Sequence, residues 1–121
     1  MTTVKDQIEA AIGAHGLWKG RLRAAIDNGR SDMPVATVRD DHQCSFGRWL
    51  FGQELDNQEK KSRHYKICVD LHRRFHLAAA DVMALALAGK KQEAAQALEG
   101  NRDFKALSTE LTRALMVWKD A

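Results

Sequence analysis

A long helical pattern between Asn57 and about Ala88 constrains the fold of this chain more than any other feature. From Tyr65 onward, apolar or small side chains recur every three or four residues, so they share one face of a helix. Asp56 is the expected N-cap, with Glu59 as its capping-box partner, and Gly89 is the expected stop. Such a helix would be about 50 Å long at 1.5 Å per residue. A helix this long and amphipathic needs partner helices along its whole apolar face.

Three further segments carry the same helical periodicity. The first runs from about Thr3 to Asn28 with Gly29 as its stop, and a shorter one covers Lys90 to Leu98. The last runs from about Arg102 to Lys119, with Asn101 as its cap. No segment shows the alternation of a strand. The pattern therefore predicts an all-α fold, in which the helices form an antiparallel four-helix bundle.

The segment between the first two long helices lacks a helical pattern. It runs from Arg30 to Gln43, and Pro34 and several acidic side chains indicate a connecting loop. An extra short helical turn, Ser45 to Phe51, follows directly after Cys44. Gly47 in this turn would allow a close approach to the backbone of a neighbouring helix.

Composition narrows the class of protein. The 121 residues suit a single domain covering residues 1–121, and the net charge of +3 comes from basic side chains interspersed with acidic ones. This argues against a nucleic-acid-binding surface. No stretch approaches the roughly 20 apolar residues of a membrane span, and the N-terminus lacks the apolar segment of a signal peptide. We therefore expect a cytoplasmic protein that binds neither nucleic acid nor membrane, whose two cysteines serve metal binding or redox sensing.

Four side chains could form a metal site. His72 and His76 lie four residues apart, which places both imidazoles on one helix face. They can reach the same ion, because zinc–nitrogen bonds are about 2.0–2.1 Å long. A thiolate from Cys44 would be a third ligand, and His15, which interrupts an apolar stripe, could be the fourth. Three histidines and one cysteine make a tetrahedral set that suits Zn²⁺ best among common metals.

Each candidate also has an ordinary structural interpretation. His15 could be a core histidine bonded to a backbone carbonyl or a hydroxyl, and Cys44 could be an inert buried thiol. Cys68 is an alternative ligand, because it lies one helical turn before His72. His42 could be a competing or secondary ligand, although we expect it to be exposed.

The order and spacing of these residues closely resemble the chemoreceptor zinc-binding (CZB) domain family of bacteria. A histidine followed two residues later by a bulky apolar residue comes first, as His15-Gly16-Leu17. After 26 residues comes the most specific block, Cys44-Ser45-Phe46-Gly47-Arg48-Trp49. After 22 more comes the histidine pair, His72 and His76.

The resemblance implies a four-helix bundle that forms a symmetric homodimer, with a buried zinc ion in each protomer. It implies His15, Cys44, His72 and His76 as the zinc ligands. It also implies a regulatory role without enzymatic activity, in chemoreceptors or beside diguanylate cyclase domains. Zinc availability, or hypochlorous acid acting on Cys44 as the redox-sensing residue, would then control a chemotaxis or cyclic-di-GMP output partner. Cys68 is a departure, because it is not part of the family motif.

The chemistry of such a site fits a sensor. Zinc holds a cysteine as thiolate, the form that oxidants attack, and loss of a ligand changes how the helices pack. A structural zinc site in a helical dimerisation module without a sensing role is the alternative function, because it would use the same ligands. Four protein ligands leave no open position for a zinc hydrolase. A di-iron bundle would need His-x-x-Glu or His-x-x-x-Glu motifs, which the chain lacks. A metal-free interaction module is a further alternative if His15 is only a core residue.

Overall fold

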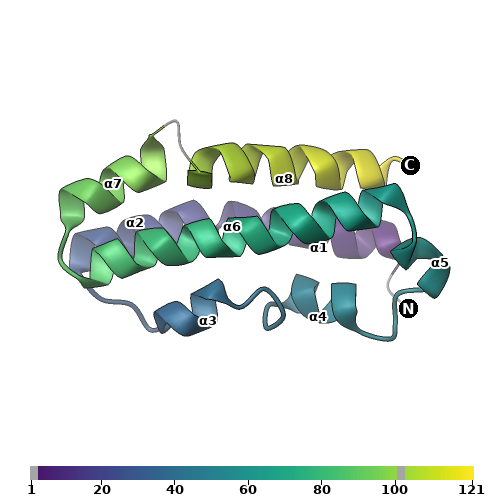
Figure 1. The fold of residues 1–121 in the computed structure, drawn as a ribbon, viewed down its shortest axis with the longest axis horizontal. Coiled ribbons are helices and arrows are strands. Elements are labelled where there is room, and N and C mark those ends of the chain that lie inside the picture. Colours follow the sequence, from purple (N-terminus) through teal and green to yellow (C-terminus); the bar gives the residue numbers. More distant parts are fainter. Residues whose placement is uncertain (1–2, 101–102) are drawn as a thin grey trace.

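The computed structural model describes residues 3–100 and 103–121, and every regular element in these ranges is a helix (Figure 1). The predicted all-α class is therefore confirmed. The predicted cap Asn101 and the predicted first helical residue Arg102 lie outside the described residues. The helices of the described part are α1 (Val4–Gly16), α2 (Trp18–Asn28), α3 (Val35–Arg39), α4 (Ser45–Phe51), α5 (Asn57–Lys60), α6 (Arg63–Leu87), α7 (Lys91–Glu99) and α8 (Asp103–Lys119).

The first predicted helix is divided into α1 and α2 at Leu17. Thr3 and Asp6 form a capping box at the start of α1. The N–H of Leu17 donates to the carbonyl of Ala14 at 3.3 Å, three residues back instead of the four of a regular α-helix. Gly29 ends α2 with a φ of +69°, as the sequence predicts.

The long helix predicted from Asn57 to Ala88 is also divided. Ser62 accepts a hydrogen bond from the N–H of Tyr65 at 3.1 Å and starts α6 anew. The 25 residues of α6 span about 38 Å instead of the predicted 50 Å. Gly89, with a φ of +77°, ends α6 as predicted.

The segment from Arg30 to Gln43, predicted to be a loop, contains the five-residue helix α3. Pro34 precedes it with a φ of −64°, and Val38 is fully buried. A helix of this length is too short to show a periodic apolar pattern, which is why the sequence does not reveal it. The predicted turn from Ser45 to Phe51 coincides with α4.

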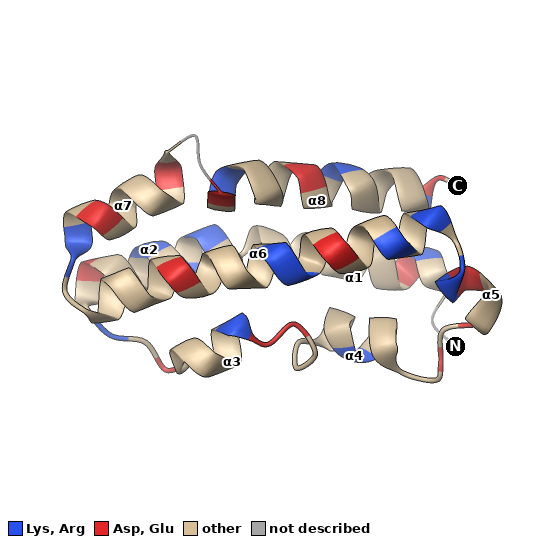
Figure 2. Ribbon diagram, in the orientation of Figure 1, with Lys and Arg blue, Asp and Glu red and all other residues tan. Residues whose placement is uncertain are grey.

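Helix α6 is the central element of the fold. It contacts α2, α3, α7 and α8, while α1 packs against α8 and α4. In Figure 1, α7 and α8 lie along one side of α6, α3 and α4 lie along the other, and α1 and α2 run behind it. No helix in the described ranges is long and apolar enough to cross a membrane. Basic and acidic residues are interspersed along α6 (Figure 2).

Candidate metal centre

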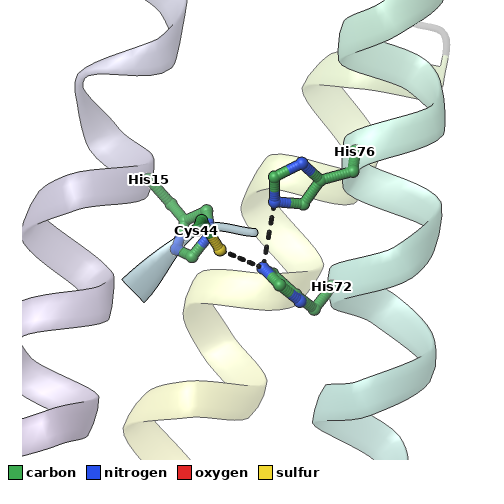
Figure 3. A group of neighbouring side chains, drawn as sticks. All are labelled: His15, Cys44, His72 and His76. Carbon is green, nitrogen blue, oxygen red and sulfur yellow. Dashed lines mark hydrogen bonds between the residues drawn. The ribbon is translucent and has the colours of Figure 1, made fainter. Parts of the chain in front are cut away.

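Four side chains that the sequence singles out meet in the interior. His15 comes from the end of α1, Cys44 directly precedes α4, and His72 and His76 project from α6 (Figure 3). Their potential ligand atoms all lie within 4.8 Å of one another. The fold thus brings together three segments that are distant in the sequence, and the group could hold a metal ion.

Cys44 is placed by the turn that follows it. It is the N-cap residue of α4, and its Sγ accepts a hydrogen bond from the N–H of Gly47 at 3.3 Å. A Cβ atom at Gly47 would lie 1.9 Å from the carbonyl oxygen of Asp41. The predicted close approach at Gly47 is therefore made to the loop before Cys44, and the prediction that it involves a helix is wrong.

Backbone carbonyls orient two of the imidazoles. Nδ1 of His15 donates to the carbonyl of Ala11 at 2.8 Å, and Nδ1 of His76 donates to the carbonyl of Val38 at 2.8 Å. A carbonyl accepts but cannot donate, so each Nδ1 carries the proton and each Nε2 keeps a free lone pair. Hydrogen bonds of this kind orient histidines that bind metals.

His72 lies at the centre of the group and is fully buried. Its Nε2 is 3.3 Å from Sγ of Cys44 and 3.0 Å from Nε2 of His76 (Figure 3). Its Nδ1 has no hydrogen-bond partner among the described residues. Several lone pairs therefore converge in a buried space, where a cation would be stabilised.

Burial sets the protonation of the group. Burial first, and the nearby His76 to a smaller extent, lower the pKa of His15 to about 4 and that of His72 to about 2. Burial also lowers the pKa of His76. All three imidazoles are thus neutral near pH 7, the form that binds metals. Burial raises the pKa of the Cys44 thiol, and a bound cation would reverse this effect.

The donor set fits zinc. Three neutral imidazoles and one thiol match the nitrogen and sulfur ligands that Zn²⁺ takes in tetrahedral sites. Four protein ligands would complete the coordination and leave no position for a reacting water. The arrangement is thus suited to structural or regulatory metal binding.

The two secondary candidates lie outside this group. His42 is exposed, stacks on Phe51 with ring centroids 4.0 Å apart and forms a second cluster with Asp40 and Asp41. Cys68 is fully buried, and burial raises the pKa of its thiol to about 12. Neither residue shares the close spacing of the four central ligand atoms.

Sequence reasoning missed the contributions of Ala11 and Val38. Both act through backbone carbonyls, which every residue possesses, so their side chains give no signal. The only indirect signal for Ala11 is its position four residues before His15 on one helix.

Comparison with known families agrees with this geometry. The family model described as the chemoreceptor zinc-binding domain (CZB) matches residues 15–83, more than half of the chain. The match includes all four residues of the central group. This is a family of regulatory zinc-binding domains of chemoreceptor-type signalling proteins and is not a known enzyme family. No significant similarity was found to a curated protein or to a solved structure.

Proposed function

Because the chain belongs to the chemoreceptor zinc-binding domain family, we propose that it is a sensory domain in which His15, Cys44, His72 and His76 bind one zinc ion. The convergence of these four ligand atoms within 4.8 Å is the observation that carries the proposal. When bound, zinc supplies the positive charge that keeps Cys44 as thiolate.

The ligands connect separate segments of the chain to α6. Cys44 is the cap of α4, and His76 on α6 holds the carbonyl of Val38 in α3. A change at the site can therefore reach α3 through the hydrogen bond of His76 to Val38 and α4 through its cap Cys44. Loss of the ligand Cys44 would loosen these two segments from α6, and this change in packing is the proposed signal.

The proposed stimulus is zinc availability or an oxidant such as hypochlorous acid. The sulfur of Cys44 attacks chlorine, forming a sulfur–chlorine bond while hydroxide leaves. Water then displaces chloride and releases a proton, which gives sulfenic acid. A sulfenic acid is a weaker zinc ligand than a thiolate, so zinc would be released and sensed as a conformational change.

Metal analysis of protein purified without added zinc tests the assignment. We expect about one zinc ion per chain in the wild type and loss of most of it in a His72→Ala variant, together with lower thermal stability. His42→Ala and Cys68→Ser are matched controls that should retain zinc, because neither side chain lies in the group. Full zinc retention by His72→Ala would contradict the ligand assignment.

We further propose an antiparallel four-helix bundle that forms a homodimer in the cytoplasm. The bundle is supported by the helices that run along the molecule beside one another: α1 with α2, α3 with α4, α6, and α7 with α8 (Figure 1).

Exposed apolar side chains support a homodimer, because a second copy of the chain could cover them. They include Leu17 (61% exposed), Val117 (53%) and Met116 (48%). Analytical ultracentrifugation should find a dimer, and a monomer at high micromolar concentration would exclude it. A chemoreceptor or diguanylate cyclase is the expected output partner.

A structural zinc site in a dimerisation module is the second candidate. The full burial of His72 and the near-complete burial of His76 favour it, because buried ligands exchange slowly. The two functions differ in their response. A sensor changes its packing when zinc is removed or Cys44 is oxidised, whereas a structural site keeps its zinc under mild oxidation.

A further inference from the structure

A cavity of about 650 Å³ lies beside the candidate metal centre. Its walls come from α1 and α2 on one side and from the segment between Met33 and Arg48 on the other. His15, Cys44 and His76 line it, whereas His72 does not. Since Cys44 is only partly buried, this cavity gives small molecules from the solvent an approach to its sulfur.

Two guanidinium groups give the cavity a positive character. Arg21 and Arg48 line it, both are exposed, and neither forms an ion pair within residues 3–100 and 103–121. Arg21 is held over the ring of Trp18, with its Cζ 5.2 Å from the ring centroid. The one carboxylate in the lining belongs to Asp40, which accepts a hydrogen bond from the backbone N–H of His42 at 2.9 Å.

We propose that this cavity is the entrance through which small anionic, thiol-reactive molecules reach Cys44, and that Arg21 and Arg48 attract them. The inference rests on the proposed function, since a bound zinc ion makes Cys44 a thiolate. Three neutral imidazoles and one thiolate leave a zinc centre with a net charge of +1, which adds to the attraction. A cleft whose lining carries more positive than negative charge raises the local concentration of anions.

Two alkylating reagents of similar size and different charge test the inference. Iodoacetate is an anion and iodoacetamide is neutral. With either one, the sulfur of Cys44 attacks the methylene carbon, a sulfur–carbon bond forms and iodide leaves. Mass spectrometry of the zinc-loaded protein gives the rate of alkylation at Cys44 for each reagent.

The double variant Arg21→Gln/Arg48→Gln should react about three- to tenfold more slowly with iodoacetate, while its rate with iodoacetamide stays within about twofold of the wild type. High salt should also slow the reaction of the wild type with iodoacetate, because it screens the attraction by the two arginines. Lys66→Gln/Arg113→Gln is the matched control, because it removes the same total charge from exposed positions that do not line the cavity. Its iodoacetate rate should remain close to that of the wild type.

Zinc content, measured on the same samples, separates the two proposals. Stoichiometric zinc with equal iodoacetate rates in the two double variants would overturn the anion entrance and leave the zinc site standing. Absence of zinc would overturn the proposed function. In that case the iodoacetate and iodoacetamide rates would be measured on the metal-free thiol of Cys44. A slower reaction of Arg21→Gln/Arg48→Gln with iodoacetate only would support the anion entrance, and equal rates would overturn it.

Discussion

At the scale of single residues, the two cysteines have different environments. Cys44 is partly exposed, and its Sγ accepts a hydrogen bond from the N–H of Gly47. The same sulfur lies 3.3 Å from Nε2 of His72. Cys68 is fully buried, and burial raises the pKa of its thiol to about 12. A thiol with such a high pKa stays protonated at neutral pH and reacts slowly. Burial also raises the pKa of Cys44, but Cys44 alone combines access to solvent with a place in the candidate metal centre, where a bound cation would hold it as thiolate.

We predict that Cys44 is the redox-active residue. Substoichiometric hypochlorous acid added to the zinc-loaded protein should place the first oxygen on Cys44, or join it to Cys68 in a disulfide if their Cα atoms can approach to within about 7 Å. Mass spectrometry locates the modification, and a chromogenic chelator follows zinc release. Zinc release should disappear in a Cys44→Ser variant. Modification of Cys68 alone, with zinc still bound, would show that the site is structural.

Residue types and their spacing allowed the sequence to single out the four residues that the fold brings together. His72 and His76 could be paired because helical geometry alone places them on one face. The carbonyls that orient His15 and His76 could not be predicted, because every residue has a backbone carbonyl and the residue type does not show which one is used. The open choice between a core histidine and a ligand at His15 also has a simple reason. His15 does bond to a carbonyl, as a core histidine would, and its other nitrogen remains available to the site.

At the scale of elements, the boundaries of the long helices were the weakest predictions. The sequence predicted Asp56 and Glu59 as a capping box, but only Asp56 caps α5, through the N–H of Gln58 at 2.8 Å. Glu59 instead accepts a hydrogen bond from Nε1 of Trp118 at 2.7 Å. A contact between residues 59 positions apart competes with the local one and cannot be read from local sequence. The break at Ser62 was missed because residues 57–62 are all polar, so no apolar pattern there marks where the apolar face of the helix begins.

Helix α4 and the loop before it are predicted to depend on Gly47. In Gly47→Ala, the new methyl group would meet the carbonyl of Asp41, so the loop and α4 must separate. We expect a loss of about 1–3 kcal/mol in the free energy of unfolding and weaker zinc binding, because Cys44 caps the same helix. Denaturant unfolding and zinc titration with a competing chelator measure the two effects.

Gly13→Ala provides the matched control for this substitution. Gly13 lies inside α1, and a Cβ atom there would meet nothing within 4 Å. Alanine should stabilise the helix by about 0.5–1 kcal/mol without changing zinc affinity. If the two variants behaved alike, close packing at Gly47 would not be what positions Cys44.

At the scale of the whole molecule, the candidate metal centre places three imidazoles in the interior of the helical fold. His15, His72 and His76 are all buried, and burial lowers the pKa of each. They interrupt the apolar core, and Nδ1 of His72 has no hydrogen-bond partner among the described residues. We therefore expect metal binding and the stability of the fold to be coupled, with pH acting on both.

The last prediction concerns the metal-free protein in acid. In the unfolded chain a histidine has a pKa of about 6.5, whereas in the folded chain the pKa is about 4 for His15 and about 2 for His72. Between these values the unfolded chain binds more protons than the folded one, so the free energy of unfolding falls as the pH falls. Stability should thus be constant above about pH 7, decline from about pH 6.5 to 4, and continue to decline below that. Each pKa unit corresponds to about 1.4 kcal/mol per group at most.

Denaturant unfolding at a series of pH values, with and without zinc, measures this dependence. Zinc at about one hundred times its dissociation constant should add about 2.7 kcal/mol near neutral pH, and this gain should vanish in acid as protons displace the metal. A metal-free His72→Leu variant should show a shallower decline than the wild type, because its side chain at the centre of the group cannot accept a proton. Equal stability of the metal-free wild type at pH 7 and pH 4.5 would mean that protonated histidines are accommodated in the folded chain. The site would then be open enough for water to enter, and burial would not be what sets the protonation of these histidines.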